Sequence, residues 1–182
     1  MSRIPTPTLE EAPTAAQPLL TAVKRQLGRA PNMFRVIANS PAALEAYLGF
    51  SAALGKGALA APTRERIALA VAEVNGCDYC LAAHTYLARN LAKLDDAEIT
   101  ANRNGASNDV KADVAVRFAA KLVRERGHVS EADVAAVKGA GYSDADIVEI
   151  IAHVALNVFT NTLNEALDTE IDFPRVTGRG AA

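Results

Sequence analysis

The chain is divided into segments by proline, glycine and serine residues of the kind that start and end helices. Pro41, Pro62 and Ser143 stand where helices are expected to begin, and Gly105 and Gly127 where they are expected to end. Between these positions the apolar residues recur with a period near 3.6. No segment alternates convincingly with the period of two that a half-buried strand requires. The sequence therefore predicts an all-α fold of eight or nine helices.

The length and the prolines set the expected domain organisation. The chain has 182 residues, half of them apolar, which suits one domain with a substantial core. Three prolines among residues 1–14 break any helix there, so we expect an extended N-terminal arm. We expect a single helical domain over residues 15–175. A flexible tail is expected over residues 176–182.

The composition and the N-terminus exclude several classes of function. The formal net charge is −2 and no basic cluster stands out, which argues against nucleic-acid binding. The N-terminus carries acids and prolines where a signal peptide needs an apolar run. The last apolar stretch is interrupted by Glu149, His153 and Asn157, so it is not expected to span a membrane. We expect a cytoplasmic protein.

Both cysteines lie in the ten residues NGCDYCLAAH, at positions 75–84. Asn75 and Gly76 are expected to end one helix, and the next should start at Cys77 or Asp78. Residues 77, 80 and 84 then share one face of that helix. Both cysteines fall in its first turn, where the helix dipole and free N–H groups stabilise a thiolate, and His84 follows one turn later. The pattern favours a reactive dithiol with a base beside it.

The preceding helix offers two acids that could orient His84. Glu65 lies between Arg64 and Arg66 on the segment TRERIALAVAEV. If the two helices pack antiparallel, a carboxylate there could reach His84 and complete a set of nucleophile, base and orienting acid. Glu73, four residues before Cys77, is the alternative acid. A Glu flanked by arginines is more often a surface ion-pair partner, so the choice stays open at this point.

Two simpler interpretations of the cysteine pair also remain. They could be buried thiols that serve as small hydrophobic residues. They could also bind zinc with His84, but this set supplies only three ligands where a structural site wants four. A reducing cytosol makes a purely structural disulfide a poor explanation of the pair. We therefore expect no metal site, and, because no haem or flavin motif is visible, no bound cofactor.

The arrangement of Glu65, Cys77, Cys80 and His84 reads Glu-x11-Cys-x2-Cys-x3-His. This spacing resembles the alkylhydroperoxidase D family, within the wider carboxymuconolactone decarboxylase-like superfamily. The stretches PNMFRVIANSPAALEAY (31–47), RERIALAVAEVNGCDYC and IAHVALNVFTNTLNEALDTEIDFP resemble the peroxidase-related branch of that superfamily. The resemblance runs from about residue 31 to residue 174.

The resemblance implies a function for each of the four residues. It implies that Cys80 becomes the sulfenic acid during peroxide reduction and that Cys77 is the proton donor and resolving thiol. It also implies that His84 and Glu65 form the proton relay. The implied protein is an all-α homotrimer or homohexamer that acts in antioxidant defence, with a hydroperoxide as substrate and an external dithiol as reductant. Neither a nucleic acid nor a membrane is an expected partner.

One position departs from the family's pattern. The best-described members carry a histidine immediately before the second cysteine, where this chain has Tyr79. A proton relay through that position is therefore lost or altered. The decarboxylase members of the superfamily lack the cysteine pair, which argues against lactone decarboxylation by this chain.

Polar side chains also form a stripe on the last apolar helix, and they are His153, Asn157, Asn161 and Asn164. Because no nucleophile lies on that helix, a polar seam at a subunit interface or surface is favoured over a wall of the active-site cavity. The aromatic residues Phe34, Tyr47 and Phe50 could line a pocket for an organic hydroperoxide or could belong to the core.

The sequence therefore predicts a dithiol peroxidase, with two rival functions. One is a thiol–disulfide oxidoreductase that does not turn over peroxide. The other is a non-enzymatic redox sensor or scaffold, which would be oxidised without sustained turnover.

Overall fold

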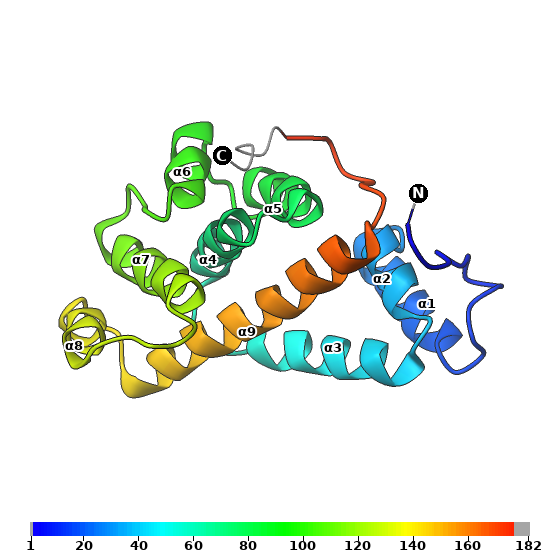
Figure 1. Ribbon diagram of the computed structural model, residues 1–182, viewed down its shortest axis with the longest axis horizontal. Helices are drawn as coiled ribbons and strands as arrows, with labels where there is room; N and C mark the ends of the chain where they lie inside the picture. The colour runs from blue at the N-terminus through cyan, green and yellow to red at the C-terminus, as the bar shows by residue number, and fades with distance from the viewer. Residues whose placement is uncertain (1, 177–182) are drawn as a thin grey trace.

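The computed structural model describes residues 2–176, and this part of the chain forms nine α-helices without strands. The predicted all-α class and helix number are confirmed (Figure 1). Residues 177–182 of the predicted tail lie outside the described residues. The helices are α1 (Gln17–Leu27), α2 (Asn32–Ile37), α3 (Pro41–Leu54), α4 (Ala61–Val74), α5 (Asp78–Asn90), α6 (Asp96–Arg103), α7 (Val110–Arg124), α8 (Glu131–Gly139) and α9 (Asp144–Leu167).

Three helices begin at serine caps, and one of these caps, Ser143, is a helix start that the sequence predicts. Ser130 and Ser143 accept the backbone N–H of Asp133 and Asp146, and both aspartates return a hydrogen bond to the cap residue's own N–H. These are complete capping boxes with Asp in place of the usual Glu or Gln. Ser40 caps α3 in the same way through its hydroxyl. Local sequence therefore determines where these three helices start.

Helix α4 lies at the centre of the fold. Its residues 67–72 are buried all around the helix, and α5, α6, α7 and α9 all contact it. Three of these six residues are alanines, which allow neighbouring helices to approach closely on several sides. The central position of α4 matters for function because the helix also carries Glu65, which is partly buried.

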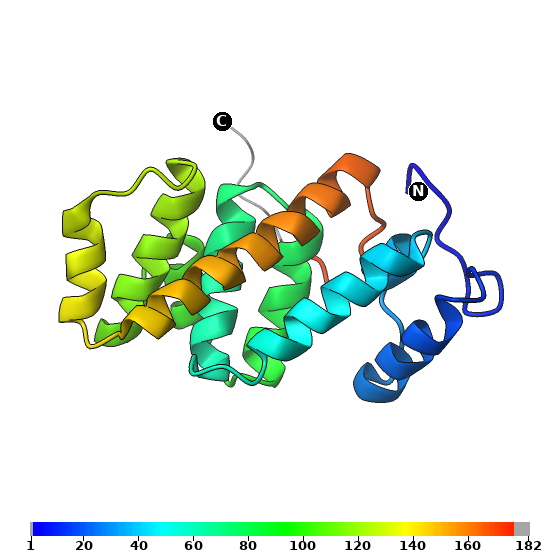
Figure 2. The same cartoon turned by 90° about the horizontal axis from the view of Figure 1, so that it is seen from below.

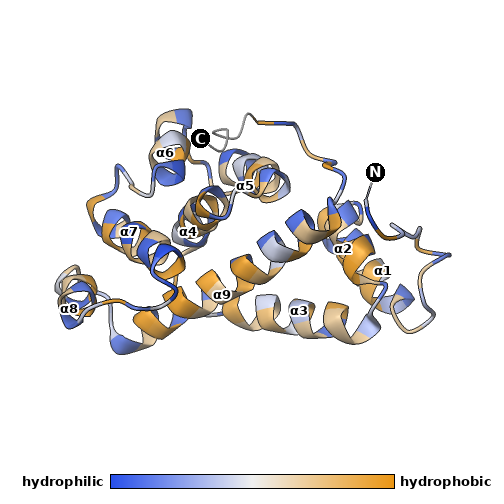
Figure 3. Ribbon diagram, viewed as in Figure 1, coloured by the Kyte–Doolittle hydropathy of each residue, from blue (hydrophilic) through white to orange (hydrophobic). Residues whose placement is uncertain are grey.

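Helix α9 runs most of the length of the molecule (Figures 1 and 2). Its 24 residues span about 36 Å. At its N-terminal end it packs with α7 and α8, and further along it packs beside α3, α4 and α5. Much of α9 is apolar (Figure 3). Its large apolar residues Val148, Ile151 and Phe159 are nevertheless exposed. Among the described residues, no helix has the length and hydropathy needed to cross a bilayer.

The N-terminal arm and the C-terminal segment are fastened to each other. The guanidinium of Arg3 donates to the carbonyl oxygens of Glu165 and Ala166, at 3.3 and 2.7 Å. These carbonyls belong to the last turn of α9, which has no basic residue of its own. The arm therefore caps the C-terminus of the longest helix from a distance in sequence.

Candidate active site

The turn between α4 and α5 places both cysteines at the start of a helix. Helix α4 ends at Val74, and Gly76 adopts φ +66°, a left-handed conformation that favours glycine. Cys77 is the N-cap of α5, and its Sγ accepts the backbone N–H of Cys80 at 3.4 Å. Cys77 is fully buried, and Cys80 is 2% exposed. The predicted placement of the dithiol in the first turn of a helix is confirmed.

The structure brings Glu65 and His84 together. Nδ1 of His84 lies 2.9 Å from Oε2 of Glu65, and each side chain is about one-fifth exposed. A carboxylate only accepts hydrogen bonds, so Nδ1 carries a proton and Nε2 is left for proton exchange. Because the thiols are buried and this pair is partly exposed, the pair offers a route for protons between Cys80 and solvent.

The neighbouring charged residues are paired elsewhere. Arg64 donates to the carbonyl oxygens of Leu54 and Gly55, and Arg66 forms a 2.6 Å ion pair with Glu98. Glu73, the alternative acid, forms a 2.7 Å ion pair with Arg103. Glu65 is therefore the acid whose carboxylate contacts His84.

The surroundings of Cys80 favour its thiolate. The hydrogen bond from the Cys77 side chain lowers the pKa of Cys80 most, and the charge of His84 and the amides of Asn164 and Asn161 lower it further. Burial acts in the opposite direction but is outweighed, so the pKa of Cys80 falls to about 6. Cys80 is therefore the thiol that is ionised at neutral pH.

The pKa values of Cys77 and His84 are both raised, whereas that of Cys80 is lowered. The hydrogen bond with Cys80, burial and the Cys80 charge raise the pKa of Cys77, so this thiol keeps its proton. Burial disfavours the charged form of His84, but the charge and hydrogen bond of Glu65 outweigh it and raise the pKa of His84. The site thus holds one thiolate, one protonated thiol and an imidazole that favours its charged form.

Helix α9 supplies a polar wall that the sequence analysis assigned to an interface or surface. All four residues of the stripe are buried within this chain, so that interpretation is wrong. Asn164 donates its Nδ2–H to Cys80 Sγ at 3.3 Å, and the Asn157 side chain is close enough to His84 to raise its pKa. Residues three to four apart share one face of a helix, and packing turns this face of α9 toward α5. The stripe is part of the candidate site.

Tyr79, which lies between the two cysteines in the sequence, forms hydrogen bonds with distant segments of the chain. Its hydroxyl accepts the backbone N–H of Met33 at 3.1 Å and donates to Asp172 Oδ1 at 2.9 Å. Its ring packs edge-on against Phe173. Burial, the largest cause, raises the pKa of Tyr79, so the hydroxyl stays protonated. Tyr79 therefore ties α5 to α2 and to the C-terminal segment.

Three aromatic rings form a row beside the thiols, and the sequence analysis named two of them, Phe34 and Tyr47. The ring centroid of Tyr47 is 5.8 Å from that of Phe34 and 6.0 Å from that of Phe159. Phe34 and Tyr47 pack against the apolar cluster that contains both cysteines. Phe50 is 40% exposed, and Phe159 of α9 was not among the sequence candidates. The rings give the surroundings of Cys80 an apolar side.

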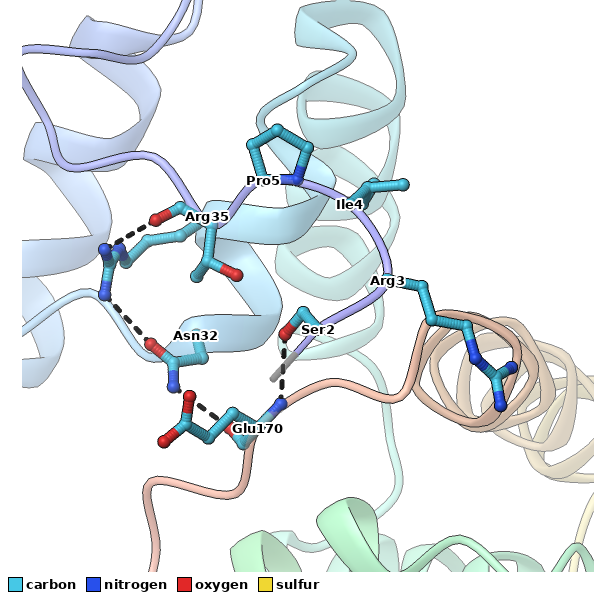
Figure 4. Close-up of a pocket in the computed structure, with 8 residues that line it drawn as sticks. Ser2, Arg3, Ile4, Pro5, Asn32, Arg35 and Glu170 are labelled. Atoms are coloured by element: carbon cyan, nitrogen blue, oxygen red, sulfur yellow. Dashed lines mark hydrogen bonds between the residues drawn. The ribbon is translucent and has the colours of Figure 1, made fainter.

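A surface hollow elsewhere takes no part in this site. It measures about 700 Å³ and lies between the N-terminal arm, α2 and the C-terminal segment (Figure 4). Its polar groups bond to one another: Arg35 contacts Asn32 and Thr6, and Glu170 contacts Ser2. Neither cysteine nor the His84–Glu65 pair lines it. Within residues 2–176, no three His, Cys, Asp or Glu side chains are grouped as metal ligands.

Comparison with known proteins finds a matching family model and similar solved structures. The family model of the carboxymuconolactone decarboxylase family matches residues 41–125, which include both cysteines, His84 and Glu65. An uncharacterized peroxidase-related protein from Ralstonia eutropha JMP134, described as an alkylhydroperoxidase core, superimposes with a TM-score of 0.84 at 26% identity. The match covers 94% of this chain and 92% of that one. These matches support a relationship to the superfamily of alkylhydroperoxidase D-like and carboxymuconolactone decarboxylase-like proteins.

Two further solved structures share the fold of this chain. An uncharacterized peroxidase-related protein from Silicibacter sp. TM1040 has a TM-score of 0.81 at 26% identity, covering 98% of this chain and 94% of that one. The debrominase Bmp8, in a complex with 2,3,4-tribromopyrrole, has a TM-score of 0.74 at 20% identity, covering 87% and 86%. At that identity the debrominase supports the fold alone. A search of curated proteins gives no significant match.

Proposed function

We propose that this protein is a thiol-dependent peroxidase that reduces organic hydroperoxides and serves antioxidant defence. The observation that carries the proposal is the line of groups from Cys77 through Cys80 to His84, with Glu65 2.9 Å behind the imidazole. A peroxidase of this kind needs a thiolate, a proton donor for the leaving group and a second thiol that resolves the sulfenic acid. The site holds all three.

The first step oxidises Cys80. His84, oriented by Glu65, takes the thiol proton, and the thiolate attacks the terminal oxygen of the hydroperoxide. The O–O bond breaks, an S–O bond forms, and the released alkoxide receives the proton from His84 to leave as an alcohol. Cys80 is then a sulfenic acid, and the peroxide has been reduced by two electrons.

The second step restores the thiols. The sulfur of Cys77 attacks the sulfenic acid of Cys80, which forms a disulfide and releases water. An external dithiol then reduces this disulfide by exchange, supplying the two electrons of the cycle. We place the reaction in the cytoplasm, where such a disulfide is reduced again.

Burial of the thiols favours this function over protein disulfide exchange. Cys77 is fully buried and Cys80 is 2% exposed, so a folded protein disulfide has no direct access to either sulfur. A small hydroperoxide reaches a buried thiolate more easily. The aromatic row of Phe34, Tyr47 and Phe159 supports an organic group on that substrate.

Steady-state consumption of an organic hydroperoxide with a panel of dithiols tests the proposal. The wild-type protein is expected to turn over, and Cys80→Ser is expected to be inactive. Reduction of disulfide substrates without peroxide consumption would instead indicate an oxidoreductase. A single oxidation without turnover with any dithiol would indicate a sensor.

A further inference from the structure

The amides of Asn164 and Asn161 lie in the interior next to Cys80. Asn164 is 2% exposed and Asn161 is 1% exposed. A buried amide normally has its donors and acceptors satisfied, because an unmade hydrogen bond in the interior costs free energy. The partners of these two amides therefore indicate which chemical group this part of the interior is built to hold.

The Asn164 amide is only half satisfied. Its Nδ2 donates to Cys80 Sγ at 3.3 Å, whereas its Oδ1 has no hydrogen-bond partner among the described residues. A neutral thiol is a weak acceptor and a thiolate is a strong one, so this N–H contact favours the charged sulfur. The free Oδ1 is an acceptor beside the atom at which the reaction takes place.

The Asn161 amide is oriented by a hydrogen bond from the turn before Cys77. Nδ2 of Asn75, in the turn before Cys77, donates to Asn161 Oδ1 at 2.8 Å. This hydrogen bond fixes which end of the Asn161 amide is the oxygen. Nδ2 of Asn161 has no partner within hydrogen-bond distance in the described part of the chain, yet the same side chain is close enough to lower the pKa of Cys80. A free, buried donor thus lies near the sulfur.

We propose that Asn164 and Asn161 form an amide pocket for the anionic sulfur of Cys80 and for the peroxide oxygen that it receives, with Asn75 as a positioning residue. Asn164 stabilises the thiolate through Nδ2. The free Nδ2 of Asn161 donates to the oxygen that becomes bonded to sulfur, and the free Oδ1 of Asn164 accepts the O–H of the hydroperoxide or sulfenic acid. The oxygen-binding part rests on the proposed peroxidase function, whereas the thiolate-binding part does not.

The test is the ionisation of Cys80, followed by thiolate absorbance or by the rate of alkylation across pH, in wild type, Asn164→Ala and the nearly isosteric Asn164→Asp. Cys77 keeps its proton, so only Cys80 titrates near neutral pH. Loss of one hydrogen bond to a charged group is expected to move the midpoint upward by about one pH unit. Asn164→Asp should move it further, because it places a negative charge beside the sulfur.

A matched control distinguishes this effect from lost packing. Asn102 is also fully buried, but its amide donates to Glu98 and the Ala106 carbonyl. Asn102→Ala should lower stability without moving the Cys80 midpoint. For Asn75, the midpoint should rise in Asn75→Ala, and this rise should vanish in an Asn161→Ala background, since Asn75 acts through Asn161.

The outcomes separate the inference from the peroxidase proposal. A raised titration midpoint of Cys80 in the Asn164 variants supports the thiolate pocket, whether or not peroxide is consumed. If no peroxide is consumed, only the peroxidase function fails. Unchanged midpoints in folded Asn164→Ala and Asn164→Asp overturn the inference even if wild type is an active peroxidase. The oxygen-binding part is overturned if Asn161→Ala reacts with hydroperoxide as fast as wild type at equal thiolate concentration.

Discussion

The imidazole Nδ1 of His84 lies 2.9 Å from Oε2 of Glu65, which comes from the preceding helix. The carboxylate stabilises the charged imidazole and raises the pKa of His84. Removing the charge in Glu65→Gln should lower the titration midpoint of His84, measured by NMR. Glu73→Gln is the matched control, because Glu73 is paired with Arg103 and should leave His84 unchanged. A His84 midpoint that responds to Glu73 and not to Glu65 would contradict the proposed relay.

The reaction of Cys80 should depend on pH with a midpoint near 6. Its pKa lies below the usual thiol value, so the reactive thiolate is present above about pH 6 and is lost as the pH falls below it. His84→Ala removes the positive charge that favours the thiolate and should raise the midpoint. The reaction with hydroperoxide should therefore slow by at least about tenfold near pH 6 and less near pH 9. Stopped-flow rates across pH check this, and an equal slowing at all pH values would count against it.

Tyr79 should contribute to stability rather than to catalysis. Tyr79→Phe leaves the Met33 N–H and the Asp172 carboxylate without their shared hydroxyl, at a cost of about 1–2 kcal/mol in the free energy of unfolding. Chemical denaturation measures this cost. Tyr86→Phe is the control, since the Tyr86 ring also contacts Phe173 but is 43% exposed. A Tyr79→Phe variant of unchanged stability that reacts slowly with peroxide would instead indicate a proton relay through Tyr79.

The apolar outer sides of α3 and α9 lead us to predict assembly into a trimer or hexamer. Val148 and Ile151 of α9 are 65% and 44% exposed, and Phe50 of α3 is 40% exposed. Ile151→Lys together with Val148→Lys should reduce the mass measured by light scattering. Val110→Lys, at an 88% exposed position at the start of α7, should not. A monomeric wild-type protein at micromolar concentration would disprove the prediction.

The parts of the fold and site that the sequence predicts are those determined by local spacing. Ser130 and Ser143 mark helix starts because a cap acts only on the residues that follow it. Cys77 and Cys80 lie in a first turn because Gly76 ends the preceding helix with a left-handed residue. Glu65 and His84 meet because two consecutive helices joined by a short turn pack against each other.

The parts that the sequence does not predict depend on contacts between distant segments. Asn164 is 84 residues from Cys80, and the polar stripe on α9 has the same spacing whether it faces a cavity or another subunit. Only the packing of α9 beside α5 decides between them. The same holds for Tyr79, whose partner Asp172 lies 93 residues away.

The central claim is that Cys80 attacks the peroxide and that Cys77 then resolves the sulfenic acid formed on Cys80. Mass spectrometry after one equivalent of organic hydroperoxide, in the presence of a sulfenic-acid trap, tests this most directly. Cys77→Ser should carry the trapped adduct on Cys80. Cys80→Ser should carry no adduct, because burial by itself still raises the pKa of Cys77. An adduct on Cys77 in the Cys80→Ser variant, with none on Cys80 in the Cys77→Ser variant, would reverse the two roles. Two titratable cysteines that both fail to react would contradict the peroxidase itself.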